Sequence, residues 1–244
     1  MSASLLRSLH VPGRPLVLPN IWDAGTARLV VEAGFPVVAT SSAAVAESLG
    51  HRDHQDASAE EMFAAAARVA RAVDVPVTVD AEAGYGLAPA ELVERLLATG
   101  AVGCNLEDTD HQNGGVVPVD RQAEYLAAVR AAAGDGLVIN ARVDVFLYAQ
   151  DDQESGLAEG IARARTYVEA GADCVYPILI RDTGLLRSFV AEVAAPVNAT
   201  KLPSLSVADL TATGVARISL AAGLWRQTKA MLSETLAGLV VGAV

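Results

Sequence analysis

The chain has 244 residues, of which 52% are hydrophobic, so it is long enough and apolar enough to bury a large core. Its net charge of −11 argues against a nucleic-acid-binding protein, because no basic stripe is present to replace the counterions of phosphates. The N-terminal residues lack a cleavable-signal pattern, and no apolar run is long enough for a membrane span. We therefore expect a single domain over residues 1–244 that acts in the cytoplasm.

Short apolar segments recur along the chain and predict eight strands. Cys104 and Cys174 fall inside two of them, which indicates buried free thiols in a reducing compartment rather than a disulfide. The predicted strands are Leu16–Trp22, Pro36–Ala43, Pro76–Gly84, Gly103–Thr109, Leu137–Val145, Cys174–Ile180, Pro196–Leu202 and Ala216–Ala222.

Alanine- and leucine-rich stretches between these strands repeat their apolar residues at three- and four-residue spacing, which is typical of helices with one buried face. They predict helices at Ala59–Ala72, Pro89–Ala98, Arg121–Ala132, Glu154–Ala170 and Ser206–Thr213. Ser58, Pro89 and Ser206 are suited to helix starts. Glycines suited to helix ends precede several strands, at Gly34, Gly100, Gly171 and Gly214.

Strands that are apolar throughout and alternate with helices should be parallel and covered on both faces. Eight of them predict a (β/α)8 TIM barrel. An open doubly wound sheet would suit six strands better, and no glycine fingerprint for a dinucleotide follows the first strand. In such a barrel, we expect the functional residues in the loops at the carboxyl ends of the strands.

Acidic residues end two successive predicted strands. Asp80 and Glu82 follow Val77–Val79, and Glu107 follows Asn105-Leu106. Oxygen ligands in this arrangement suit Mg²⁺, for which Mn²⁺ can substitute. The alternative for each acid taken alone is a solvated strand end. Two such strands in succession favour a metal site.

Six segments, two of which contain these acids, occur in a specific order along the chain: Asn20–Arg28, Ala39–Ser42, Gly50–Asp53, Val79–Gly86, Asn105–Asp108 and Asn140–Asp144. Together they resemble the isocitrate lyase/phosphoenolpyruvate mutase superfamily, in its carboxyphosphonoenolpyruvate phosphonomutase-like branch. The resemblance runs from about residue 16 to about residue 230. It implies a TIM barrel, a Mg²⁺ ion and a 2-oxo acid substrate that chelates the metal.

The resemblance also implies roles for individual acids. Asp80 corresponds to the direct metal ligand, and Glu82 and Glu107 correspond to carboxylates that hold the waters of the metal. Asp53 corresponds to an acid beside the metal. For Asp53 the alternative is a solvated loop residue, since charged residues surround it in the sequence.

On the same resemblance, Arg142 binds the substrate carboxylate from one side, and the turn at Ser41 and Ser42 binds it from the other. A planar guanidinium is suited to a carboxylate because it offers two parallel donors. The alternative for Arg142 is a structural salt bridge to Glu107 or Asp144. The alternative for the two serines is a polar strand end.

The loop at residues 108–118 departs from the family. Lyases of the superfamily carry Lys-Lys-Cys-Gly-His or Lys-Arg-Cys-Gly-His there, whereas this loop has no cysteine and no lysine, which argues against isocitrate or methylisocitrate cleavage. Only Asn113 remains of the residues that handle a phosphoryl group, and Tyr176–Leu179 lacks the mutase histidine. His111 is either an acid or base on a lid or a solvated residue, and His51 carries the same alternatives.

The leading hypothesis is a Mg²⁺-dependent, lyase-type enzyme that cleaves a C–C bond of an oxaloacetate-like 2-oxo acid through a metal-stabilised enolate. One alternative is P–C bond chemistry of the phosphonopyruvate hydrolase or phosphoenolpyruvate phosphonomutase type. Another is a non-catalytic protein that binds a 2-oxo acid. A Schiff-base aldolase at Lys201 is also open, although the acidic cluster would then have no purpose.

Residues 224–244 predict a C-terminal helix and an apolar tail. Leu232, Leu236, Leu239, Val240 and Val241 form an apolar surface with no later segment to cover it. A soluble monomer rarely leaves such a surface in water, so we expect a homo-oligomer, either a dimer or a tetramer. The resemblance implies that this helix is exchanged between subunits.

Overall fold

The computed structural model describes residues 2–149 and 152–240. Its strands are short, and a loop or a helix follows each of them. They are β1 (Leu16–Leu18), β2 (Asn20–Ile21), β3 (Val38–Thr40), β4 (Val77–Asp80), β5 (Gly103–Leu106), β6 (Val138–Val143), β7 (Cys174–Pro177), β8 (Asn198–Thr200) and β9 (Arg217–Ser219).

The strands form a closed ring of parallel neighbours. One sheet runs in the order β2-β3-β4-β5-β6-β7, and the other in the order β1-β9-β8. A bridge between Val175 and Val197 joins β7 to β8, and β1 and β2 are one strand interrupted at Pro19, which has no N–H to donate. The predicted (β/α)8 barrel is therefore confirmed, with β1 and β2 counted as its first strand.

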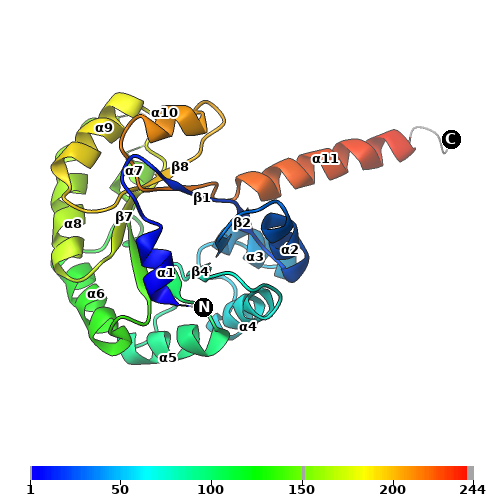
Figure 1. Cartoon of the computed structure of the whole chain (residues 1–244), viewed down its shortest axis with the longest axis horizontal. Helices are drawn as coiled ribbons and strands as arrows, with labels where there is room; N and C mark the ends of the chain where they lie inside the picture. The colour runs from blue at the N-terminus through cyan, green and yellow to red at the C-terminus, as the bar shows by residue number, and fades with distance from the viewer. Residues whose placement is uncertain (1, 150–151, 241–244) are drawn as a thin grey trace.

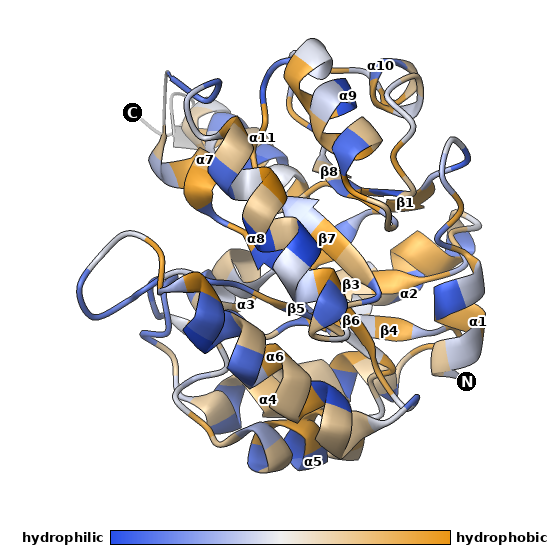
Figure 2. Ribbon diagram, turned by 90° about the vertical axis from the view of Figure 1, so that its left-hand side faces the viewer, coloured by the Kyte–Doolittle hydropathy of each residue, from blue (hydrophilic) through white to orange (hydrophobic). Residues whose placement is uncertain are grey.

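Helices surround this ring (Figure 1). Figure 2 shows α4, α5, α6 and α8 on the outside of the strands. The helices are α1 (Ala3–Ser8), α2 (Ala24–Glu32), α3 (Ser42–Leu49), α4 (Ala59–Ala70), α5 (Pro89–Thr99), α6 (Val119–Ala133), α7 (Val145–Tyr148), α8 (Leu157–Glu169), α9 (Thr183–Glu192), α10 (Val207–Thr211) and α11 (Gly223–Val240).

The predicted helix boundaries rest on local hydrogen bonds that the structure contains. Ser58 and Ser206 each accept from a backbone N–H in a capping box, and Pro89 is the first residue of α5. The four predicted terminal glycines all have positive φ, between 88° and 102°. The predicted strand Pro36–Ala43 is wrong at its end, because the Ser41 side chain accepts from Ala44 N and begins α3 there.

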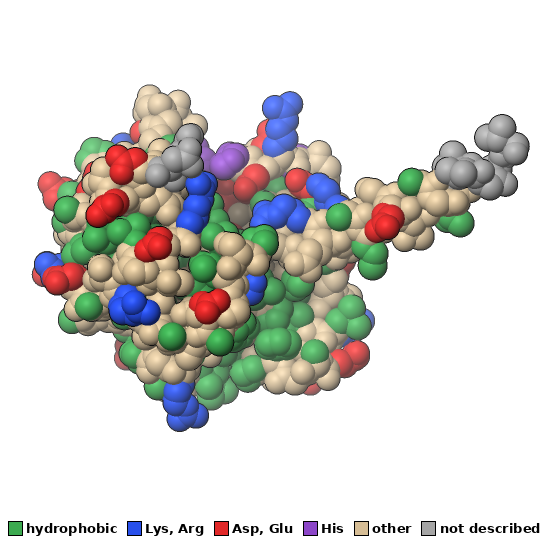
Figure 3. Space-filling model, turned by 90° about the horizontal axis from the view of Figure 1, so that it is seen from above, with side chains coloured by type: hydrophobic (Ala, Val, Ile, Leu, Met, Phe, Trp, Pro, Cys, Tyr) green, Lys and Arg blue, Asp and Glu red, His purple; other side chains and the backbone are tan. Residues whose placement is uncertain are grey.

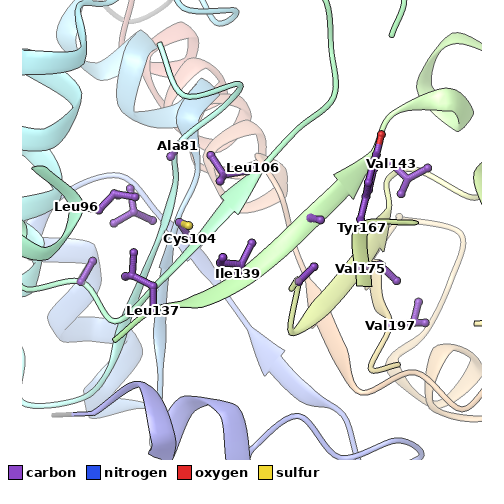
Figure 4. Close-up of a cluster of buried hydrophobic side chains, with 14 of the residues drawn as sticks. Ala81, Leu96, Cys104, Leu106, Leu137, Ile139, Val143, Tyr167, Val175 and Val197 are labelled. Atoms are coloured by element: carbon purple, nitrogen blue, oxygen red, sulfur yellow. The ribbon is translucent and has the colours of Figure 1, made fainter. Parts of the chain in front are cut away.

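The main core lies between the barrel strands and the surrounding helices. Figure 4 shows part of it, with Leu106, Ile139 and Val175 from adjacent strands. A smaller cluster closes the amino-terminal end of the barrel, where α1 inserts the fully buried Leu6. Cys104 and Cys174 are buried and unpaired, as predicted.

Helix α11 projects from the barrel (Figures 1 and 3). Its first turns contact the body, because Trp225 packs edge-on against Trp22 at 4.9 Å between ring centroids and the Lys229 ammonium lies 2.5 Å from Glu47 Oε2. Beyond this anchor the apolar side chains are exposed, namely Met231, Leu232, Leu236 and Leu239. The predicted tail continues through Val241 to residue 244, outside the described residues. Over the described ranges, no helix has the length and apolarity required to cross a membrane.

Candidate active site at the carboxyl end of the barrel

The barrel topology brings the predicted acidic motifs together. Strand β5 lies between β4 and β6, with Asp80 in register with Asn105 and Asn105 in register with Asn140. A cavity of about 780 Å³ lies at the carboxyl ends of these strands, with Glu107 in its wall. The loops after β4 and β5, the loop at residues 51–56 and one face of α6 line this cavity; Glu107, His111, Gln55, Tyr85 and Arg121 are among the lining residues.

Asp80 is held at the end of β4 by hydrogen bonds from three sides. Its Oδ2 accepts from the backbone N–H of Ser42 at 3.1 Å and from the Ser42 hydroxyl at 2.9 Å. Its Oδ1 faces the Asn105 amide at 3.5 Å, and its own N–H donates to the Thr40 hydroxyl at 2.9 Å. Ser42 thus positions the predicted metal ligand, and Ser41 next to it caps helix α3.

Glu82 is a buried acid in a strained turn. Its φ is +48°, in the left-handed region that non-glycine residues seldom occupy, and its Oε2 accepts from the backbone N–H of Gln55 at 2.7 Å. Burial, followed by the negative charges of Asp80, Glu107 and Asp53, raises the pKa of Glu82 to about 8. The site therefore concentrates negative charge that a cation would relieve.

Glu107 lies between a histidine and an arginine. Its Oε1 is 2.7 Å from His111 Nε2, and its Oε2 is 2.5 Å from Arg142 Nη1. Burial raises the pKa of Glu107, although Arg142 and His111 act in the opposite direction. For His111, burial is the largest single effect and lowers the pKa, but the hydrogen bond to Glu107 and the negative charges of Glu107 and Glu82 together make the net shift upward.

Arg142 is engaged by two carboxylates at once. Its Nε and Nη2 donate to Asp144 at 3.0 and 2.6 Å, and its Nη1 pairs with Glu107. These contacts with described residues take three of the five N–H donors of the guanidinium. The salt-bridge alternative considered from the sequence is therefore realised with both acids, and two N–H groups remain for a ligand.

A buried network behind Arg142 escaped the sequence reasoning. Asp108 accepts from the backbone N–H of Asp144 at 2.8 Å, from the Tyr167 hydroxyl at 2.6 Å and from Arg163 at 3.1 Å. Burial, with Asp144 next in strength, raises the pKa of Asp108 to about 6. The network fixes Asp144 and through it Arg142. The only sequence signal was the position of Asp108 directly after Glu107, since its arginine and tyrosine partners lie more than fifty residues away.

Three of the side chains could hold one metal ion. Ligand atoms of Glu82, Glu107 and His111 lie within 4.8 Å of one another. This group shares Glu82 and Glu107 with the predicted set of Asp80, Glu82 and Glu107. The Asp80 carboxylate, whose charge contributes to the raised pKa of Glu82, is hydrogen-bonded to Ser42. Buried carboxylates with raised pKa values fit a divalent cation, and the added imidazole suits Mn²⁺ as well as Mg²⁺.

Other predicted residues have contacts of their own. Asp53 is half-buried in the loop beside Glu82. His51 contacts Glu61 at 3.3 Å outside the cavity, and the Lys201 ammonium donates to the Leu202 carbonyl at 2.8 Å. The amide of Asn113 donates to Asp110 within the exposed loop. Asn113 lines the cavity, whereas Asp53, His51 and Lys201 do not.

Comparison with known proteins places this site in a family context. A family model described as phosphoenolpyruvate phosphomutase matches residues 6–240. A crystal structure of a Burkholderia cenocepacia J2315 protein, provisionally named a phosphonomutase, is 40% identical, with 98% of each chain covered and a TM-score of 0.90. An oxaloacetate acetylhydrolase solved with its product oxalate is 26% identical, covers 99% of this chain and 88% of its own, and has a TM-score of 0.87. The 2-methylisocitrate lyase of Bacillus subtilis (strain 168) is 30% identical over 75% of this chain and 62% of the lyase.

Proposed function

The chain belongs to the phosphoenolpyruvate phosphomutase family, and we propose that it is a lyase-type enzyme that cleaves a C–C bond in a small dicarboxylic 2-oxo acid. The cation would be Mg²⁺ or Mn²⁺. The single observation that carries this proposal is the convergence of Glu82, Glu107, His111 and Arg142, of which Glu107 and His111 line the cavity. Similarity to an oxaloacetate acetylhydrolase and to a 2-methylisocitrate lyase supports the substrate class.

In this proposal, the acidic residues bind the cation and Arg142 binds the substrate. Glu82 and Glu107 would hold the cation together with Asp80, whose carboxylate Ser42 keeps in place. When bound, Mg²⁺ supplies Lewis-acid stabilisation of negative charge on the oxygen of the oxo acid. Arg142 would bind a substrate carboxylate through its two remaining N–H groups, at a position that Asp144 fixes.

His111 is the residue best placed to move a proton. It lies in the loop that differs from the lysine- and cysteine-containing stretch of the lyases, and its Nε2 contacts Glu107. An imidazole with a raised pKa in the cavity wall could give a proton to the carbanionic product of C–C cleavage. This assignment gives the loop a chemical role without a cysteine.

P–C bond chemistry is a second candidate. The similarity to the Burkholderia phosphonomutase-like protein favours it, and Arg121 on α6 supplies a cation to the cavity wall. The loop at residues 108–118 nevertheless carries two aspartates and no lysine or arginine, which disfavours a doubly charged phosphonate. The C–C reaction therefore stands first.

The test is a substrate panel with purified protein and either Mg²⁺ or Mn²⁺. The panel contains oxaloacetate, phosphonopyruvate and substituted malates. We expect oxaloacetate to be consumed, with carbon products detected by NMR and no phosphate released from phosphonopyruvate. Activity should disappear with EDTA and in Asp80→Asn. Phosphate release would select the second candidate, and tight oxo-acid binding without turnover would indicate a binding protein. Inactivation by borohydride in the presence of substrate would instead favour a Schiff base at Lys201.

A further inference from the structure

A buried arginine without a carboxylate partner lies inside the barrel beneath the candidate site. Arg217 on β9 has 1% of its surface exposed, and its Nη2 donates to Asn105 Oδ1 at 3.1 Å. Strands β9 and β5 lie opposite each other in the ring, so this bond crosses the barrel interior. No ion pair among residues 2–149 and 152–240 involves Arg217, and its Nε and Nη1 have no hydrogen-bond partner there.

The bond fixes the direction of the Asn105 amide. An arginine offers only donors, so the oxygen of the amide must face Arg217, and the nitrogen must face the other way. Asn140 reinforces this choice, because its amide nitrogen donates to the same oxygen at 2.8 Å. The Asn105 nitrogen is thereby turned toward Asp80 Oδ1, 3.5 Å away.

Stability does not explain an arginine at this place. A fully buried guanidinium with two unpartnered nitrogens costs free energy, and an apolar side chain of similar size would avoid that cost. Asp80 stands at the other end of the contact chain, at the base of the acidic cluster. The unfavourable burial of Arg217 therefore occurs at a position that is linked, through Asn105, to a candidate metal ligand.

We propose that Arg217 is a positioning residue that acts through Asn105 to orient the Asp80 carboxylate for the divalent cation. The proposal rests on the proposed function, because it takes Asp80 as a metal ligand. Arg217 is not among the residues that line the cavity, so its effect should appear in metal binding before any chemistry takes place.

A double-mutant cycle on Mn²⁺ binding tests this relay. Mn²⁺ affinity is measured by isothermal titration calorimetry without substrate for wild type, Arg217→Met, Asn105→Leu and the double variant, with urea unfolding as the control for folding. We expect each single variant to bind Mn²⁺ about tenfold more weakly. The double variant should be no weaker than either single one, because both changes break the same chain of contacts. Arg217→Lys keeps a donor-only cation and should bind within about threefold of wild type.

The outcomes separate this inference from the proposed function. If Asp80→Asn binds Mn²⁺ as wild type does, the proposed site is wrong. If Asp80→Asn loses binding while Arg217→Met keeps it, the site stands and the relay is overturned. Additive losses in the double variant would also overturn the relay, since Arg217 would then act independently of Asn105. If Arg217→Met alone does not fold, the double variant, in which two buried polar groups are removed together, supplies the comparison with Asn105→Leu.

Discussion

His111 Nε2 lies 2.7 Å from Glu107 Oε1, four residues earlier in the chain, so the loop after β5 folds back over the acid that ends this strand. The contact places an imidazole in the candidate metal-binding group and in the cavity wall. A loop that appears polar and featureless in the sequence thus supplies a group with acid–base chemistry.

His111→Gln should lower kcat by roughly 100-fold, because general acid–base catalysis typically contributes a factor of this order. KM should change little, since the proposed function assigns binding of the substrate carboxylate to Arg142. Steady-state kinetics on the substrate identified by the panel checks this. His51→Gln is the matched control, because His51 contacts Glu61 and is not among the residues that line the cavity. Equal losses in the two variants would remove His111 from the mechanism.

The raised pKa of Glu82 predicts that cation binding is coupled to the release of a proton. With a pKa of about 8, Glu82 is mostly protonated at pH 7 in the metal-free protein, and a cation needs the carboxylate. Binding of Mg²⁺ or Mn²⁺ should therefore release a proton, and affinity should rise with pH until about pH 8. Calorimetry in two buffers of different ionisation enthalpy measures the release. Glu82→Gln should abolish both the release and most of the affinity, whereas the exposed Glu94→Gln should change neither.

The same shift predicts how folding stability depends on pH. A raised pKa in the folded state means that the stabilising contribution of Glu82 is complete below its unfolded pKa near 4.5 and is lost as pH rises through 8. Metal-free Glu82→Gln should match wild type at pH 4.5 and exceed it at pH 8.5 by a free energy of unfolding on the order of 4 kcal/mol. Urea unfolding in EDTA at the two pH values decides this. A constant difference between the proteins would contradict the assigned pKa.

Arg142→Lys should damage both binding and stability. An ammonium cannot reproduce the two parallel bonds to Asp144 while it also contacts Glu107, so at least one buried carboxylate loses a donor. We expect KM for the oxo acid to rise at least about tenfold and unfolding free energy to fall by about 1–3 kcal/mol. The exposed Arg95→Lys is the control, because its pair with Glu91 is solvent-exposed. An unchanged KM would limit Arg142 to a structural role.

Local signals explain which parts of the fold were predictable. Ser58 and Pro89 mark their helices within a few residues, and the eight apolar runs give the barrel directly. The start of α3 was missed because the predicted strand was extended through Thr40, Ser41 and Ser42 to Ala43. In the structure β3 ends at Thr40, and the Ser41 side chain accepts from Ala44 N to cap α3. Boundaries set by a single capping bond cannot be read from hydrophobicity.

Long-range pairing explains which parts of the site were not predictable. Asp80, Glu82 and Glu107 stand out in the sequence because each follows a strand. The contact of Asp108 with Arg163 joins residues 55 positions apart, and that of Arg217 with Asn105 joins residues 112 positions apart. Such partners become visible only when the barrel closes. Arg217 in particular resembles a surface residue in the sequence, yet the alternation along β9 turns it inward.

The exposed part of α11 predicts an oligomer. Its base is fixed by Trp225 and Lys229, while the apolar residues farther along the helix stand free of the barrel, with Leu232 and Leu236 about half exposed at 54% and 52%. Burying such side chains is worth roughly 1.5–3 kcal/mol each, so a second copy of the chain that covers them would be stabilised strongly. We expect light scattering to show a dimer or tetramer at micromolar concentration.

Leu232→Glu/Leu236→Glu should convert that assembly to monomers, because burying two carboxylates in an apolar interface costs more than the contacts return. Ser233→Glu changes the charge of an exposed position on the same helix and should leave the assembly intact unless Ser233 itself lies in the contact. The far-UV circular dichroism of each variant controls for loss of the helix. A monomeric wild type would mean that the apolar residues of α11 serve no contact between copies, and exchange of the helix between subunits would be excluded with it.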